Sequence, residues 1–234
     1  CNFVPNDESR VIYSTQYDMI QGEDKGQARN LLADYITEQG TIDPVITSEW
    51  KITNVPFENK FTDVTEKDWF HDVVLELAAS GVVNGMTETT FEPQGTLTRA
   101  EFATMLYRVS YAPVVTGKST YSDVKTGDWY YDAVVWGLSR GVVNGTTMST
   151  FSPDLSCTRA QAVTFLWRAA GRPEPSGNTA FADVPADSYY AAAVAWAAEN
   201  GFTNGTGSGC FSPDDLCTRA QIVTLLYRQL TKEI

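Results

Sequence analysis

Three arginines at a constant spacing are the residues of this chain best suited to binding chemistry. Arg99, Arg159 and Arg219 lie 60 residues apart, and each stands between a threonine and Ala-Glu or Ala-Gln. A guanidinium group is permanently charged and can hold both oxygens of a carboxylate through paired hydrogen bonds. Each arginine is expected at the first position of a helix, where unpaired N–H groups and the helix dipole also favour an anion.

A purely structural role is equally compatible with these residues. Asp63, Asp123 and Asp183 recur at the same spacing and could pair with the arginines, which would only join parts of the repeat. Many paired charges in proteins are structural. The residue types and their spacing alone therefore do not decide whether the arginines bind a ligand or only join parts of the repeat.

The arginines belong to a repeat whose three copies span about 61–110, 121–170 and 181–230. Each copy opens with an aromatic residue followed by x-Asp-Val, passes through Gly-x-x-Asn-Gly, and reaches Phe-x-Pro just before the Thr-Arg-Ala motif. Repeats of this kind indicate units that bury their apolar faces against one another.

Two helices are expected in each copy. On the first, Trp69, Val73, Val74, Leu77 and Ala78 fall on one face at helical spacing. The expected N-caps and C-terminal glycines of this helix are Asp68, Asp128 and Ser188, and Gly81, Gly141 and Gly201. The second helix begins with a capping box, formed by Thr98 with Glu101, Thr158 with Gln161, and Thr218 with Gln221.

These elements predict a mainly α fold in which three helix-pair repeats form one pseudo-three-fold domain over residues 61–234. Residues 1–60 lie outside the repeat and are interpreted as the end of an upstream module or as a cap. Within them, residues 26–36 read as an amphipathic helix, and 45–47 and 50–52 as short strands.

The composition excludes several classes of function. With 29 acidic and 17 basic residues the net charge is −12, which argues against a nucleic-acid partner. No run of 18 apolar residues is present, so no membrane span is expected. One histidine, and cysteines without metal-ligand spacing, predict no metal site and no cofactor. No catalytic constellation recurs in the copies, which predicts that the repeats are not an enzyme.

The four cysteines lead to separate expectations. Cys157 and Cys217 share one repeat position, which favours a buried, apolar role. Cys210 and Cys217 flank one short loop and could instead form a disulfide. Cys1 is compatible with a lipid-modified terminus, but we favour a cut in a longer chain.

In these motifs the chain closely resembles the S-layer homology domain of bacterial surface proteins, over about 170 of the 234 residues. The resemblance implies a three-pronged pseudo-trimer around a central three-helix bundle. It also implies a non-catalytic, extracellular role at a Gram-positive type of cell wall. There the domain would anchor a surface protein by binding secondary cell-wall polysaccharide, often pyruvylated, in grooves between the prongs. The alternative is an assembly module that self-associates in a surface array.

The resemblance favours binding by the three arginines, whose partner would be the carboxylate of a pyruvyl ketal. The other candidate glycan-binding residues are Asp63, Asp123 and Asp183, Trp69, Trp129 and Tyr189, and Gly85, Gly145 and Gly205. The aspartates could accept sugar hydroxyls or cap a turn. The aromatic side chains could stack on a sugar or enter the core. The glycines serve backbone geometry and could admit a ligand. Tyr189 replaces tryptophan in the third copy, which argues against equal use of the three grooves.

Overall fold

The computed structural model describes residues 58–177 and 181–231. Within these ranges it contains six helices and no strand, and none of the helices is long and apolar enough to cross a membrane. The helices are α2 (His71–Ala79), α3 (Arg99–Val109), α4 (Tyr131–Ser139), α5 (Arg159–Ala169), α6 (Ala191–Glu199) and α7 (Arg219–Thr231). The helix and strands expected between residues 26 and 52 lie outside the described residues.

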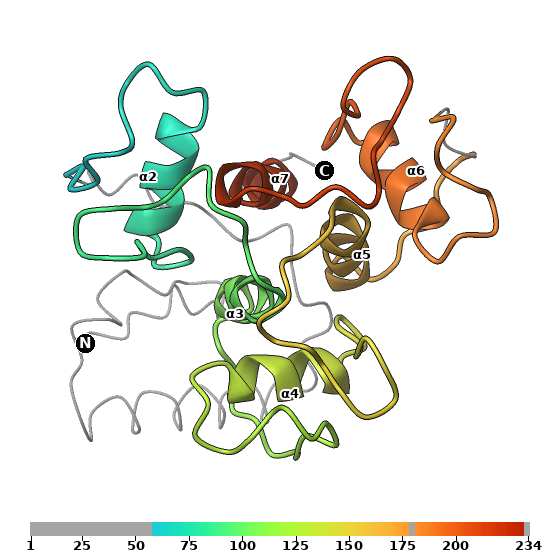
Figure 1. The fold of residues 1–234 in the computed structure, drawn as a ribbon, viewed down its shortest axis with the longest axis horizontal. Helices are drawn as coiled ribbons and strands as arrows, with labels where there is room; N and C mark the ends of the chain where they lie inside the picture. Colours follow the sequence, from blue (N-terminus) through green and yellow to red (C-terminus); the bar gives the residue numbers. More distant parts are fainter. Residues whose placement is uncertain (1–57, 178–180, 232–234) are drawn as a thin grey trace, which may run out of the picture.

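The helices are arranged with an approximate three-fold axis. In Figure 1, α3, α5 and α7 are seen end-on at the centre, and α2, α4 and α6 lie around them. The predicted fold class, with three helix-pair repeats around a central bundle, is confirmed. Each outer helix packs against the central helix of the preceding repeat, so α4 contacts α3 and α6 contacts α5. The first outer helix, α2, packs against the last central helix, α7, which closes the ring.

The central helices begin as the sequence predicts. Thr98 accepts a hydrogen bond from the N–H of Glu101, and the Glu101 side chain accepts one from the N–H of Thr98. The same reciprocal pairs form at the starts of α5 and α7. Apolar residues of these helices then fill the core, and Phe102 stacks on Phe165 with ring centroids 6.1 Å apart.

A ring of backbone hydrogen bonds joins the three chain segments that enter the central helices. The N–H of Leu97 donates to Cys217 O, that of Cys217 to Cys157 O, and that of Cys157 to Leu97 O, at 3.3, 3.0 and 2.7 Å. All three side chains are fully buried. The predicted buried role of Cys157 and Cys217 is therefore confirmed. Burial raises the pKa of the Cys157 thiol to about 12 and that of Cys217 to about 11.

The possible Cys210–Cys217 disulfide does not form, because both cysteines are free thiols in the structure. Cys217 is buried at the ring of hydrogen bonds, whereas Cys210 lies half-buried in its loop. The short separation in sequence is therefore misleading, since the two side chains serve different parts of the fold.

The predicted side-chain caps of the outer helices are wrong. Each of these helices has nine residues, and the residue before it makes no side-chain capping bond. The carboxylate of Asp68 instead accepts hydrogen bonds from the N–H and hydroxyl of Thr65, at 2.7 and 2.9 Å. In the third copy Pro185 has no N–H to donate, and Ser188 stands where the other copies have aspartate. The predicted C-terminal glycines are confirmed, since Gly81, Gly141 and Gly201 have φ of 73°, 66° and 71°.

The two sets of aromatic residues in the outer segments have opposite environments. Trp69, Trp129 and Tyr189 precede their helices and are 62%, 65% and 60% exposed, so a core role is wrong for them. Trp136 and Trp196, whose positions inside the outer helices favour the core, are buried. The helical spacing that places Trp69 with Val73 in the sequence fails because the helix begins only at His71.

Replacing a buried and an exposed tryptophan of the second repeat tests this assignment. Trp136→Ala is expected to lower the free energy of unfolding by about 3–5 kcal/mol, because it leaves a cavity beside Tyr107, whose ring centroid lies 5.6 Å away. Trp129→Ala is expected to change it by less than about 0.5 kcal/mol. Urea denaturation followed by circular dichroism measures both, and similar losses in the two variants would contradict the assignment.

Candidate functional site

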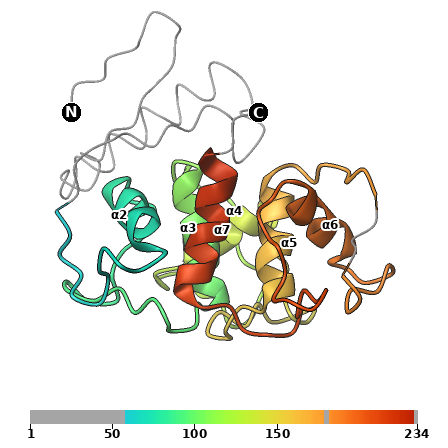
Figure 2. The ribbon, with the colours of Figure 1, turned by 90° about the horizontal axis from the view of Figure 1, so that it is seen from above.

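The three central helices, each of which starts with one of the arginines, begin at the same end of the bundle (Figure 2). There the first two backbone N–H groups of each helix already donate hydrogen bonds within the protein. Arg99 N donates to Leu155 O at 2.9 Å, and Ala100 N donates to Pro153 O at 3.0 Å. Equivalent bonds join α5 to residues 213–215 and α7 to residues 93–95. The expectation that free helix N–H groups await an anion is therefore wrong, because the next repeat occupies them.

Each arginine side chain also reaches into the next repeat. We call the segment from the Asn-Gly pair to the central helix the entry loop, and an arginine together with the entry loop that it contacts an arginine site. Arg99 Nε donates to Phe151 O at 3.0 Å, and its Nη2 donates to Asn144 O at 2.6 Å. Its guanidinium carbon lies 4.7 Å from the centroid of the Phe151 ring. Arg99 is only 2% exposed, and this burial lowers its pKa.

Arg219 is the most fully engaged of the three arginines. It donates from Nε to Phe91 O at 2.9 Å and from Nη2 to Asn84 O at 3.0 Å. Its Nη1 also forms an ion pair with Glu101 Oε1 at 3.2 Å, and both side chains are largely buried. Burial lowers the pKa of Arg219, while Glu101 and the nearby Glu92 and Asp63 act in the opposite direction.

Arg159 is less enclosed. Its Nε donates to Phe211 O at 2.7 Å, and its guanidinium carbon lies 4.8 Å from the centroid of that ring. Its side chain is half-buried rather than buried. Within the described residues its two Nη groups form no hydrogen bond or ion pair.

The three aspartates hold their own entry loops. Asp63 accepts the N–H groups of Phe91 and Glu92, at 2.8 and 2.7 Å. Asp123 and Asp183 do the same with the equivalent residues of their repeats. Burial is the largest single effect and raises the pKa of Asp183, but backbone hydrogen bonds and Arg159 together outweigh it, so the pKa is lowered. Each aspartate therefore caps a turn, which is one of the two roles expected from the sequence, and both of its carboxylate oxygens accept a backbone hydrogen bond. No direct ion pair joins these aspartates to the arginines among the described residues.

One candidate aromatic residue interacts electrostatically with an arginine. Tyr189 of the third repeat and Arg99 of the first repeat affect each other's pKa. Burial is the main cause that raises the pKa of Tyr189, and Arg99 and Arg168 oppose it. The surroundings of Arg99 therefore include an electrostatic influence from the third repeat. The pseudo-three-fold symmetry predicts Trp69 beside the Arg159 site and Trp129 beside the Arg219 site.

The three candidate glycines are packed from within the fold. A Cβ on Gly145 would lie 2.5 Å from Thr150 O and 2.6 Å from Cε1 of Tyr121. Gly85 and Gly205 face their own entry loops and the aromatic residue that opens the repeat in the same way. A side chain at any of these three positions would collide with atoms of the same repeat, which explains why glycine is required there.

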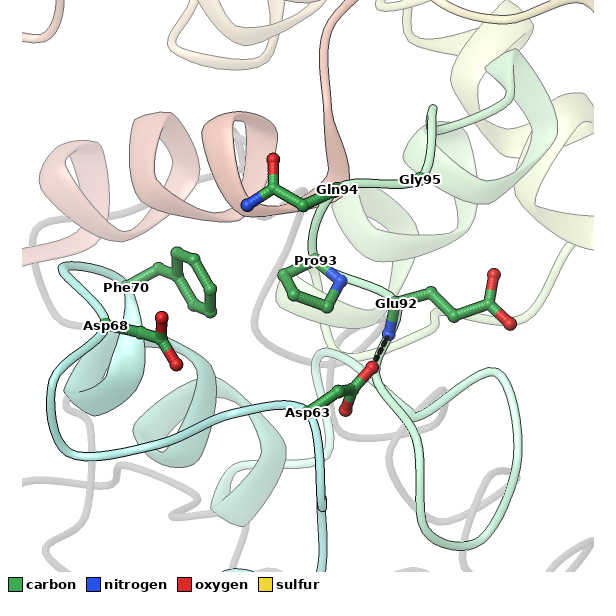
Figure 3. A pocket seen from close by; sticks show the side chains of 7 residues that line it. All are labelled: Asp63, Asp68, Phe70, Glu92, Pro93, Gln94 and Gly95. Atoms are coloured by element: carbon green, nitrogen blue, oxygen red, sulfur yellow. Dashed lines mark hydrogen bonds between the residues drawn. The ribbon is translucent and has the colours of Figure 1, made fainter.

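A shallow cavity of about 480 Å³ lies beside the Arg219 site (Figure 3). Asp63, Asp68, Phe70 and residues 92–95 line it, and the dashed line in Figure 3 marks the hydrogen bond from Glu92 N to Asp63. Gly95 also accepts the N–H of Arg219, so the cavity adjoins the start of α7. With three carboxylates in its lining, this cavity is unfavourable for an anion. The described residues contain no cluster of side chains suited to a metal ion.

The repeated geometry coincides with a known family. The model of the S-layer homology domain matches residues 60–103, 120–163 and 180–223, once in each repeat. The chain belongs to the S-layer homology family. S-layer homology repeats form an anchoring module, not a catalytic domain, and the chain is associated with the cell surface and the cell wall.

Relatives of the chain include both enzymes and surface proteins. An amylopullulanase of Thermoanaerobacterium thermosulfurigenes is 34% identical over 75% of this chain, and exoglucanase XynX of Acetivibrio thermocellus is 34% identical over 74%. A surface-layer 125 kDa protein of Lysinibacillus sphaericus is 29% identical over 68%. The matches cover only 10%, 16% and 14% of these three proteins. The shared part is thus a small module of longer proteins.

The role of Glu101 as a partner of Arg219 was missing from the sequence expectations, which gave it only the capping box. The signal was present, since the first copy has glutamate where the others have Gln161 and Gln221. The sequence does not say that this side chain faces the arginine of another repeat.

Replacing two of the arginines tests how differently they are held. Arg219→Ala is expected to lower the free energy of unfolding by about 3–5 kcal/mol, because it leaves the carboxylate of Glu101 without its cation. Arg159→Ala loses one hydrogen bond and one ring contact, for which about 1–2 kcal/mol is expected. Thermal and urea unfolding measure both values, and equal losses would show that the two arginines have equivalent structural roles.

Proposed function

We propose that this domain anchors a longer surface protein by binding cell-wall polysaccharide that carries acidic, pyruvylated sugars. The observation that carries the proposal is the exposure of three large aromatic side chains at one equivalent position of the three repeats. Trp69, Trp129 and Tyr189 are each at least 60% exposed, although the fold buries most of its other large aromatic side chains. Exposed aromatic rings with a polar edge suit stacking on the apolar face of a sugar.

The arginines supply the charge that such a ligand needs. The net charge of −12 disfavours anions over the molecule as a whole, so an acidic sugar requires a local cation. A guanidinium with free N–H groups can bind the ketal carboxylate while the neighbouring ring stacks on the sugar. The electrostatic interaction of Tyr189 with Arg99 supports the proposal that the exposed ring of one repeat and the arginine of another border a common surface. For the candidate aspartates and glycines we propose an indirect role, in which they hold the shape of the entry loops that form the binding surface.

The module is proposed to serve cargo elsewhere in the full-length protein. Relatives named as enzymes share only this small part of their length, which fits attachment of a separate catalytic domain to the wall. Self-association in a surface array is the second candidate, and it is favoured by a relative that is named a surface-layer protein.

Titration calorimetry of the chain with purified, pyruvylated wall-polymer fragments tests the proposal. We expect binding that is lost after chemical removal of the pyruvyl groups. We also expect at least tenfold weaker binding when Trp69, Trp129 and Tyr189 are all replaced by alanine, because sugar stacking is lost. Circular dichroism controls for folding.

Three results would count against the proposal. Binding that survives depyruvylation would support a wall-polymer role but exclude recognition of the pyruvyl carboxylate. Unchanged binding by the triple variant would exclude a binding role for the three aromatic residues. Concentration-dependent oligomers without affinity for the polymer, measured by analytical ultracentrifugation, would favour the assembly module.

A further inference from the structure

The three arginine sites are related by sequence but differ in the charge that each has available. In the Arg219 site the guanidinium is paired with Glu101 at 3.2 Å and bonded to two backbone carbonyls. A ligand carboxylate would have to compete with a carboxylate that the capping box already fixes in place, since Glu101 Oε2 also accepts the N–H of Thr98 at 2.7 Å. This site has little capacity left for an anion.

The Arg99 site lacks such an acidic partner, but its guanidinium is enclosed. The rings of Phe151 and Phe165 lie 4.7 and 5.3 Å from its central carbon, and two backbone carbonyls accept its N–H groups. Only 2% of the residue is exposed. A ligand could reach this charge only if the packing around it opened.

The Arg159 site is accessible, and among the described residues no carboxylate forms an ion pair with its guanidinium. Arg159 is half-buried, and its single hydrogen bond from Nε leaves both Nη groups without a partner among the described residues. Asp183 acts on it electrostatically, but its carboxylate is held by two backbone N–H groups, as in the other copies. The exposed Asp214 and Asp215 lie on the same entry loop and form no ion pair with Arg159 in the described structure.

A neutral residue at the position of Glu101 distinguishes Arg159 and Arg99 from Arg219, and the greater exposure of Arg159 distinguishes it from Arg99. Arg219 of the third repeat meets Glu101 of the first, so the same relation places Gln221 next to Arg159, and Gln161 next to Arg99. Gln221 completes the capping box by accepting the N–H of Thr218 at 3.1 Å. It therefore supports the helix start without cancelling the charge of Arg159.

We infer that the domain binds the anionic sugar predominantly at one of its three sites, where Arg159, with both Nη groups available and the neutral Gln221 at the position of Glu101, holds the carboxylate. The inference rests on the proposed function and assigns the charged contact to one site. A single site per molecule also distinguishes this domain from a trivalent binder, whose affinity for a polymer would rise through multiple attachments.

A matched pair of substitutions tests the inference by calorimetry with short pyruvylated wall-polymer fragments. Gln221→Glu places a carboxylate next to Arg159, and Gln161→Glu makes the same change next to Arg99. Glutamate forms the complete capping box in the first repeat, so both variants should fold, which thermal unfolding verifies. We expect one fragment bound per wild-type chain, at least tenfold weaker binding by Gln221→Glu, and a change of less than twofold in Gln161→Glu.

The outcomes separate this inference from the proposed function. Wild-type chain that binds no fragment overturns both. Binding of three fragments per chain, or equal weakening by the two variants, overturns the single-site assignment and leaves the wall-polymer role intact. Arg159→Lys adds a further check, because lysine keeps the positive charge but cannot form two parallel hydrogen bonds to a carboxylate. Affinity equal to that of the wild type would exclude a bidentate contact between Arg159 and the ligand.

Discussion

The structure depends on the way each repeat completes the helix start of the one before it. The first N–H groups of a helix have no partner within the helix, and here the entry loop of the next repeat supplies carbonyls for two of them. The capping box satisfies a third. The arginine bonds to the same loop, and the ring through Leu97, Cys157 and Cys217 closes around the axis. No repeat can form these bonds alone, so folding of the three copies is coupled.

The same arrangement limits what the arginines can do for a ligand. Side chains that hold neighbouring repeats together are buried by that role, as Arg99 and Arg219 are. Repetition nevertheless lets the copies diverge, because stability is shared over the ring while each site keeps its own residues. A glutamate at the third helical position neutralises one arginine, whereas a glutamine keeps the cap and leaves the charge. The exposed aromatic residues are under no such constraint, since they lie before the outer helices and outside the core.

Much of this architecture could be predicted from the sequence because local motifs have local physical causes. The capping boxes, the left-handed glycines and the buried Trp136 and Trp196 all follow from short patterns. The neighbour of each repeat could not be predicted in this way, because a 60-residue period states which positions are equivalent but not which copy touches which. For the same reason the partners of Arg219 and of the helix N–H groups were missed. Trp69 was misplaced because its spacing continues a helical pattern beyond the residue where the helix begins.

Native-state hydrogen exchange of the amides of Leu97, Cys157 and Cys217 tests the coupling of the three repeats most directly. These N–H groups form the closed ring, so opening any one of them should require the unfolding of all three repeats. The account predicts one common free energy of exchange for the three amides, equal to the free energy of global unfolding measured with urea. Exchange of one amide through a local opening of much lower free energy, with the other two still protected, would show that the repeats fold independently and would contradict the account.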